Sequence, residues 1–308
     1  MTLPIISINE FTNKKINIAN DIGNSCKEYG FFIIKDHDIK ITDIENIKTK
    51  SKALFNLSLK DKMRYHQIKG GGQRGYTPFG IEKAKDSINP DQKEFWHHGR
   101  SNWNSKFRDI MPSNEKVNQI ENFDKSLCHF YENLDILGQK ILSYIALYLG
   151  LSSKWFYEKT NQGNSILRLI HYPPSDKDNN GLRASPHEDI NLITLLFGTQ
   201  QEGLEILDQD NKWIPIKTDS DIVVCNVGDM LQRLTNKKFI STTHKVVNPK
   251  SNIKNISRYS MPFFIHLNPD FYIETLNSCV DDNSPNNFPN GILADDYLKE
   301  RLKEINLK

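Results

Sequence analysis

Three polar side chains in the second half of the chain have the types and the spacing of a metal site. His187 and Asp189 come from Ser-Pro-His-Glu-Asp, and His244 comes from Ser-Thr-Thr-His-Lys. Side chains two positions apart on a strand share a face, so His187 and Asp189 can bind one ion together. Two imidazoles and one carboxylate leave the opposite positions of a metal open, which is typical of oxygen-activating ferrous iron. Zinc accepts the same ligands, so a zinc-dependent hydrolase on a cupin-like barrel is an alternative.

A second pair of residues could grip an acid close to this metal. Arg258 and Ser260 stand two positions apart in Arg-Tyr-Ser-Met-Pro-Phe-Phe. A guanidinium pairs bidentately with a carboxylate, and the serine adds a hydroxyl. Tyr172, directly before two prolines, is a candidate third contact. An ordinary ion pair at Arg258 and a core position for Tyr172 are the competing interpretations. A zinc hydrolase has no special need of such a clamp, so the pair favours iron.

The bulk composition excludes several classes of protein. The 308 residues carry 40 Lys and Arg against 38 Asp and Glu, a net charge of +2. This near balance argues against a nucleic-acid-binding or membrane-surface protein. No apolar run approaches the ~20 residues that span a bilayer. The four cysteines are isolated, which predicts neither a zinc knuckle nor a disulfide framework. We therefore expect a soluble, cytoplasmic protein.

Both helices and strands are expected to position these residues, because the apolar residues of the sequence follow two different repeats. Apolar residues spaced by three and four predict helices over 16–29, 41–57, 115–149 and 293–307. Short apolar or alternating runs predict strands over 5–8, 31–34, 166–172, 192–197, 222–227, 244–247 and 259–267, and a hairpin over 204–216. The glycine-rich segment from Gly70 to Tyr76 is expected to be irregular. Many short strands at regular spacing favour a sandwich or barrel over a wound parallel sheet.

These fragments together resemble the isopenicillin N synthase-like family of Fe(II)- and 2-oxoglutarate-dependent oxygenases. The match runs from Tyr-Gly-Phe-Phe-Ile-Ile-Lys-Asp-His-Asp-Ile at 29–39 through Arg-Leu-Ile-His-Tyr-Pro-Pro at 168–174. His187-x-Asp189, Gly-Asp-Met-Leu-Gln at 228–232, the segment around His244, and Arg258-x-Ser260 follow in the family's order. The resemblance implies that His187, Asp189 and His244 bind the iron. It also implies that Arg258 and Ser260 hold the far carboxylate of 2-oxoglutarate, with Tyr172 in support.

The resemblance also implies a mixed α+β fold with a mainly β core. This core is a double-stranded β-helix, or jelly roll, with flanking helices. We expect an N-terminal mixed α/β region at 1–112, a long supporting helix at 113–158, the jelly-roll core at 159–270 and a helical tail at 271–308. Two positions depart from the family pattern. Ile170 replaces an asparagine that could contact the co-substrate, and Asp38 replaces a glycine after His37.

The expected substrate-facing residues lie mainly in 70–99, because the family uses this region to roof its pocket. The candidates are Gln73, Arg74, Tyr76, Phe95 and His97, joined by Arg183 near the metal motif and Phe263 after the clamp. A core position for Phe95 and a loop position for Arg183 are the simpler interpretations. Arg74 and Arg183 suggest a small substrate that carries a carboxylate.

The predicted function is the oxidation of a small organic substrate with dioxygen and 2-oxoglutarate, releasing succinate and CO2. Hydroxylation, desaturation and cyclisation share the same metal ligands, so the sequence does not choose among them. Some members of this family keep an arginine-serine pair for another acid and do not use 2-oxoglutarate. A non-catalytic jelly-roll binding module is the last alternative, because it has no need of both a metal triad and an acid clamp. The oligomeric state is left open.

Overall fold

The computed structural model describes residues 3–9, 15–67, 72–85, 87, 89–174, 181–197, 203–216, 221–249 and 256–305. Gly70 and Gly71 of the glycine-rich segment lie outside these residues, as does the end of the expected C-terminal helix beyond 305. Among the residues that the structure describes, no helix combines the length and the apolarity needed to cross a membrane.

The larger sheet has eight strands in the order β1-β2-β10-β7-β12-β5-β4-β3. β1 pairs with β2 in parallel, and the other neighbours are antiparallel. The N-terminal part of the chain supplies two strands at each edge, so it extends the core sheet on both sides. The strands are β1 (Ile5–Ser7), β2 (Phe31–Lys35), β3 (Gly75–Thr77), β4 (Glu94–Gly99), β5 (Ile166–Tyr172), β7 (Ile193–Phe197), β10 (Val223–Val227) and β12 (Arg258–Ile265).

A four-stranded sheet in the order β6-β11-β8-β9 faces the larger one. Residues of both sheets line a single cavity of about 320 Å³, as expected for the mouth of a jelly roll. In the small sheet β6 and β11 are antiparallel neighbours that place His187 opposite His244. The pairing thus joins two segments that are far apart in sequence. These strands are β6 (Ala184–His187), β8 (Leu204–Leu207), β9 (Trp213–Pro215) and β11 (His244–Val246).

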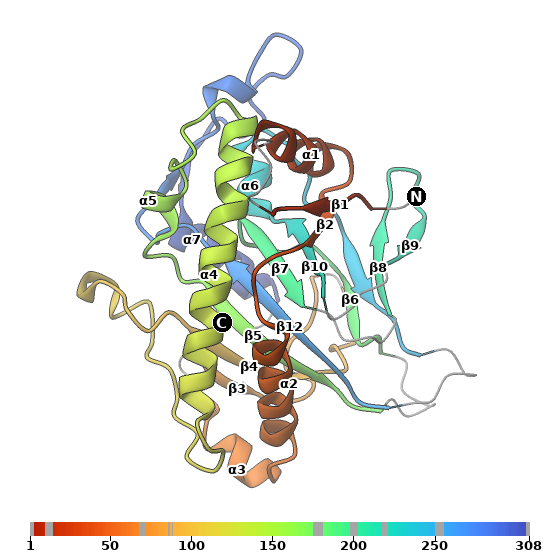
Figure 1. The fold of residues 1–308 in the computed structure, drawn as a ribbon, viewed down its shortest axis with the longest axis vertical. Coiled ribbons are helices and arrows are strands. Elements are labelled where there is room, and N and C mark those ends of the chain that lie inside the picture. The colour runs from red at the N-terminus through yellow and green to blue at the C-terminus, as the bar shows by residue number, and fades with distance from the viewer. Residues whose placement is uncertain are drawn as a thin grey trace.

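Three helices cover the face of the large sheet that points away from the cavity. They are α1 (Lys15–Glu28), α2 (Ile41–Phe55) and α4 (Phe123–Tyr148). Figure 1 shows α4 running along the molecule, with α1 and α2 beside it and the strands behind. The apolar stripe of α4 is fully buried at Leu127, Leu134 and Ile141. The core therefore lies between α4 and the sheet, and it supports the strands that carry the site.

The long helix begins later than the predicted Glu115. Its first residue is Phe123, after Asn122 in a left-handed conformation at φ 53°. Val117 and Ile120 still pack against the core without being helical. Their apolar spacing therefore imitates a helical stripe, and the left-handed residue interrupts any continuous helix.

The C-terminal part returns to the cavity. α7 (Ala294–Glu304) turns Leu298 and Leu302 toward it, so the last helix forms part of the cavity wall. The remaining elements are α3 (Leu59–Met63), α5 (Tyr157–Thr160), α6 (Asp229–Leu234), the 3-10 turns η2 (Ser105–Phe107) and η3 (Asn277–Cys279), and the paired strands β13 (Tyr272–Ile273) and β14 (Ile292–Leu293).

Most of the expected strands are confirmed, including the hairpin of β8 and β9. Asp208 Oδ1 accepts backbone N–H groups of Asp210 and Lys212 at 3.0 and 2.8 Å, and Asn211 takes a left-handed turn conformation. The segment from Gly70 to Tyr76 was expected to be irregular, and this was wrong for its last two residues. Gly75 and Tyr76 belong to β3, because their backbone pairs with the unpredicted strand β4.

Candidate active site

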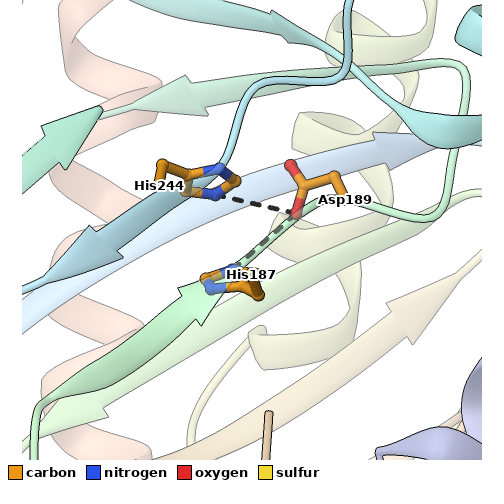
Figure 2. A group of neighbouring side chains, drawn as sticks. All are labelled: His187, Asp189 and His244. Atoms are coloured by element: carbon orange, nitrogen blue, oxygen red, sulfur yellow. Dashed lines mark ion pairs between the residues drawn. The ribbon is translucent and has the colours of Figure 1, made fainter. Parts of the chain in front are cut away.

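His187, Asp189 and His244 converge at the mouth of the jelly roll. One ligand atom from each lies within 4.8 Å of the others. Asp189 Oδ1 is 4.0 Å from His187 Nε2 and 3.9 Å from His244 Nε2, and Figure 2 shows this oxygen directed at both rings. Each separation is below twice a ligand–metal bond of about 2.1 Å, so one ion can bridge the carboxylate to either imidazole. These three side chains fit a metal ion.

The two strands position these side chains differently from the sequence expectation. His187 is the last residue of β6 and His244 is the first residue of β11. Asp189 lies beyond the end of β6 rather than on it, so the shared strand face was not the reason for its placement. The loop after β6 turns the carboxylate back toward the imidazoles.

Backbone carbonyl groups fix which imidazole nitrogen faces the metal position. Nδ1 of His187 lies 2.7 Å from the Ser185 carbonyl oxygen, and Nδ1 of His244 lies 3.2 Å from the Thr242 carbonyl oxygen. A carbonyl oxygen only accepts, so each Nδ1 carries the proton and each Nε2 keeps a free lone pair. Burial lowers the pKa of His244 to about 4, with the neighbouring His187 adding to the effect. The imidazole of His244 is therefore neutral, as a metal ligand requires.

Asp189 is held by two donors on the oxygen that points away from the imidazoles. Thr194 Oγ1 donates to Oδ2 at 2.5 Å and Asn226 Nδ2 donates to it at 2.8 Å. Burial alone would raise the pKa of Asp189. The two imidazoles and these hydrogen bonds outweigh burial, so the pKa is lowered. The carboxylate is thus ionised, with Oδ1 left to bind a cation.

The acid clamp lines the same cavity. Arg258, Ser260 and Tyr172 are all lining residues, and the Arg258 guanidinium lies 5.0 Å from the centre of the Tyr172 ring. Arg258 is 1% exposed, and its Nε and Nη1 atoms have no hydrogen-bond partner among the described residues. A buried guanidinium with unpaired N–H groups is costly unless an acid completes it. The donors present therefore fit a carboxylate of the expected co-substrate.

Two of the seven expected substrate residues, Gln73 and His97, line the cavity, and the other five do not. Arg74 is fully buried, with its guanidinium packed where a side chain at Gly99 would stand. It donates to the Gln73 carbonyl oxygen at 2.7 Å and to Asn164 Oδ1 at 2.9 Å. Tyr76 instead donates to Glu94 at 2.5 Å.

The other three residues are placed by packing. The Arg168 guanidinium lies over the Phe95 ring, with its central carbon 4.2 Å from the ring centre. Phe263 packs against Tyr131 at 4.9 Å, because it points to the opposite face of β12 from Arg258 and Ser260. Arg183 is buried and donates to the Ile256 carbonyl oxygen at 3.0 Å.

Several polar residues on the cavity wall were missed from the sequence, among them Glu82, Asp91, Lys93, Arg168 and His266. His266 had a signal, because the alternation of β12 that places Arg258 and Ser260 continues through Pro262 and Phe264 to His266. The other four had no signal in the sequence. Glu82, Asp91 and Lys93 precede β4, and they meet Arg168 of β5 only in the folded chain.

Comparison with known proteins places the chain. A model of the 2OG-Fe(II) oxygenase superfamily matches residues 163–267, and a model of the non-haem dioxygenase N-terminal region matches residues 3–119. A 2-oxoglutarate-Fe(II) type oxidoreductase from Emericella nidulans is 26% identical over 94% of this chain and 85% of the relative.

Solved structures agree with these matches. A full-length Neurospora crassa protein, solved in complex with alpha-KG, is 26% identical, with a TM-score of 0.86 over 98% of this chain and 95% of that chain. A 2OG-Fe(II) oxygenase family protein from Caulobacter crescentus is 41% identical, with a TM-score of 0.90 over 98% of both chains. With a double-stranded β-helix, a His-Asp-His triad and these likenesses along almost its whole length, this chain belongs to the 2OG-Fe(II) oxygenase superfamily.

Proposed function

We propose that this chain oxidises a small organic molecule held in the 320 Å³ cavity, with Fe(II) on His187, Asp189 and His244 and 2-oxoglutarate on Arg258. One observation carries the proposal. A buried arginine with unpaired N–H groups lines the same cavity as the three candidate metal ligands. A metal-dependent hydrolase needs no buried arginine of this kind. A dicarboxylate co-substrate needs one, because the arginine can hold one of its carboxylates while the rest of the molecule lies near the metal.

The residues of the chain have separate tasks in this proposal. When bound, Fe(II) and 2-oxoglutarate supply the oxidising chemistry, in which dioxygen converts 2-oxoglutarate to succinate and CO2 as the substrate is oxidised. Thr194 and Asn226 fix the Asp189 carboxylate, and the Ser185 and Thr242 carbonyl groups fix the imidazoles. Arg258 and Ser260 would orient the co-substrate through its far carboxylate, with Tyr172 beside them.

The nature of the substrate is the finer part of the proposal. The Neurospora crassa protein has also been solved with alpha-KG and thymine, which supports a small molecule as the substrate class here. A carboxylate on the substrate was expected from Arg74 and Arg183, and neither residue lines the cavity. That expectation therefore loses its support.

The proposal is tested by metal content and by succinate formation. Protein purified without oxygen is reconstituted with Fe(II), and succinate release from 2-oxoglutarate is measured with and without candidate substrates. His187→Ala should lose both iron and succinate release. Arg258→Ala should keep iron and bind 2-oxoglutarate about 10- to 150-fold more weakly, as a charge-assisted hydrogen bond contributes about 1.5–3 kcal/mol.

Matched controls separate these effects from general damage. His129→Ala and Arg64→Ala change exposed side chains on α4 and after α3, and both should behave like the unaltered protein. Full iron content in His187→Ala, or unchanged 2-oxoglutarate affinity in Arg258→Ala, would refute the assigned roles. Tight zinc binding with no succinate formed would instead favour the hydrolase alternative.

A further inference from the structure

Part of the cavity wall carries charges that neutralise one another. Lys93 Nζ lies 2.5 Å from Glu82 Oε1 and 2.8 Å from Asp91 Oδ2. Arg168 meets the same Glu82 with Nη1 at 3.2 Å and Nη2 at 3.1 Å. Two cations and two carboxylates make this wall neutral, and Glu82, Asp91 and Lys93 are almost completely buried. We call these four side chains the paired wall.

The remaining cations on the cavity are paired as well, with one exception. Lys85 pairs with Glu304 at 3.3 Å, and Arg301 pairs with Asp229 at 3.0 Å. Among the described lining residues, only the Arg258 guanidinium has no carboxylate partner, and its place belongs to the co-substrate. A carboxylate on the substrate would therefore be buried without a cation to compensate it, which is strongly unfavourable.

The same wall still offers uncharged hydrogen-bonding groups. Arg168 donates Nε–H to His97 Nε2 at 2.6 Å and one Nη1 hydrogen to Glu82 Oε1 at 3.2 Å, and its Nη2 forms an ion pair with Glu82 Oε2 at 3.1 Å. A guanidinium has five N–H groups, so Arg168 keeps further N–H groups that can donate to a ligand. Gln73 accepts from Asn164 with Oε1 at 3.1 Å, which leaves its Nε2 amide available.

His266 adds a donor and an acceptor to this wall. It lines the cavity, it is 5% exposed, and its buried Nδ1 has no hydrogen-bond partner among the described residues. Burial lowers the pKa of His266 to about 4, so the ring is neutral near pH 7. A neutral imidazole has one N–H that donates and one nitrogen that accepts. Such a ring matches a ligand edge that has both an N–H and a carbonyl oxygen.

We propose that the substrate is uncharged where it meets this wall, and that it presents an amide-type edge, as in an amide, lactam or cyclic imide, to Arg168, Gln73 and His266. This inference rests on the proposed function, since it places the substrate beside the 2-oxoglutarate site. One feature opposes it. The Arg74 cation lies behind Gln73 without a carboxylate partner among the described residues, and its charge would favour an anion if the wall opened.

The experiment compares acids with uncharged molecules of the same skeleton. The pairs are uracil with orotate, 2-pyrrolidinone with pyroglutamate, and benzamide with benzoate. Each is presented at millimolar concentration to the full chain loaded with Zn(II), a diamagnetic stand-in for iron, and 2-oxoglutarate. Saturation-transfer difference NMR reports binding. The 2-oxoglutarate affinity of every preparation is measured first, so failure of the proposed function appears as loss of co-substrate binding before any pair is added.

The expected result is binding of at least one uncharged member and of none of the acids. His266→Ala should weaken that binding about three- to tenfold, the value of one neutral hydrogen bond, while 2-oxoglutarate binds as before. His266→Asn, which keeps a donor and an acceptor, should recover part of the loss. His129→Ala, on the exposed face of α4, should bind like the unaltered protein.

A charge change on the wall tests the electrostatic part separately. Glu82→Gln leaves Arg168 without its carboxylate, so an acid should bind more tightly to this variant than to the unaltered chain. Unchanged 2-oxoglutarate affinity shows that Glu82→Gln is folded. If that affinity is lost, the proposal is judged from the unaltered chain and His266→Ala alone. The proposal is overturned if the acids bind the unaltered chain as well as their partners do, or if no uncharged member binds. Acid binding that disappears in Arg74→Met would assign recognition to Arg74 instead.

Discussion

His187 and His244 each donate their Nδ1 proton to the backbone carbonyl group two residues earlier in the chain. Both rings thereby face the metal position with Nε2. Asp189 is also oriented by hydrogen bonds. Thr194 and Asn226 donate to its Oδ2, which leaves Oδ1 directed at the metal position. The metal ligands are therefore positioned by groups that an HxD motif does not contain.

Thr194→Val tests this positioning. The valine has nearly the same shape but cannot donate to Asp189, so the carboxylate is free to turn and Fe(II) should bind about 10- to 100-fold more weakly. Metal affinity is measured by anaerobic titration, and circular dichroism reports the fold. Thr49→Val, on the exposed face of α2, is the control. Unchanged metal affinity in Thr194→Val would show that Asp189 does not depend on this hydrogen bond.

At the residue scale, the sequence predicts the metal ligands and the clamp well but the substrate residues poorly. The ligands and the clamp lie in short motifs whose spacing carries the information. The strand parity that selects Arg258 and Ser260 excludes Phe263 and points to His266, so this error was avoidable. The meeting of Arg168 with Glu82 was not predictable, because the two residues are separated by 86 positions and no local pattern joins them.

At the scale of elements, α4 is the support on which the strands of the site rest. Its buried face packs against the large sheet, including β12, which carries the clamp. The sequence predicts this helix from its apolar stripe but extends it past Asn122, because upstream residues also pack on the core. It misses β3 and β4 because one is a glycine-containing strand of three residues and the other is a run in which every residue is buried.

Leu134→Ala tests the contribution of α4. The leucine is fully buried in the main core, so its truncation should lower the free energy of unfolding by about 2–5 kcal/mol. Ile136, two positions along the same helix, is 68% exposed, and Ile136→Ala should change stability by less than about 0.5 kcal/mol. Urea unfolding followed by circular dichroism measures both. Equal effects of the two substitutions would contradict the packing described for α4.

At the scale of the whole molecule, the site is built from both ends of the chain. The N-terminal part contributes Gln73, Glu82 and Lys93 to the cavity, and α7 contributes Leu298 and Leu302. The molecule also buries several neutral histidines near its centre. Burial lowers the pKa of His98 to about 3 and those of His244 and His266 to about 4, and it lowers the pKa of His97 well below the usual value.

These histidines predict how stability depends on pH. The unfolded chain takes up protons on them below about pH 6.5, whereas the folded chain does not. Their contribution is therefore complete above that pH and is lost as the pH falls, by about 1.4 kcal/mol per pH unit for each histidine. Asp229 and Asp124 act in the opposite sense, because burial raises the pKa of both carboxyl groups, that of Asp229 to about 6, but they are two groups against four histidines.

Urea midpoints of the metal-free protein at pH 7.5, 6.5, 5.8 and 5.0 check this dependence. The midpoint should be level down to about pH 6.5 and should then fall steadily toward pH 5.0. The range ends above the ordinary carboxyl pKa values of about 3.9–4.3, so most carboxylates stay ionised and histidines contribute most of the change. A midpoint that stays level to pH 5.0 would mean that these rings are not held neutral in the fold.

Iron and 2-oxoglutarate are expected at one place in the molecule, and a crystal structure can locate both. Crystals grown without oxygen in the presence of Fe(II) and 2-oxoglutarate are measured at the iron absorption edge. We predict an anomalous peak bound by Nε2 of His187, Nε2 of His244 and Oδ1 of Asp189, with a 2-oxoglutarate carboxylate on Arg258 and Ser260. An iron peak away from those three atoms, or a co-substrate carboxylate bound elsewhere than Arg258, would contradict the account.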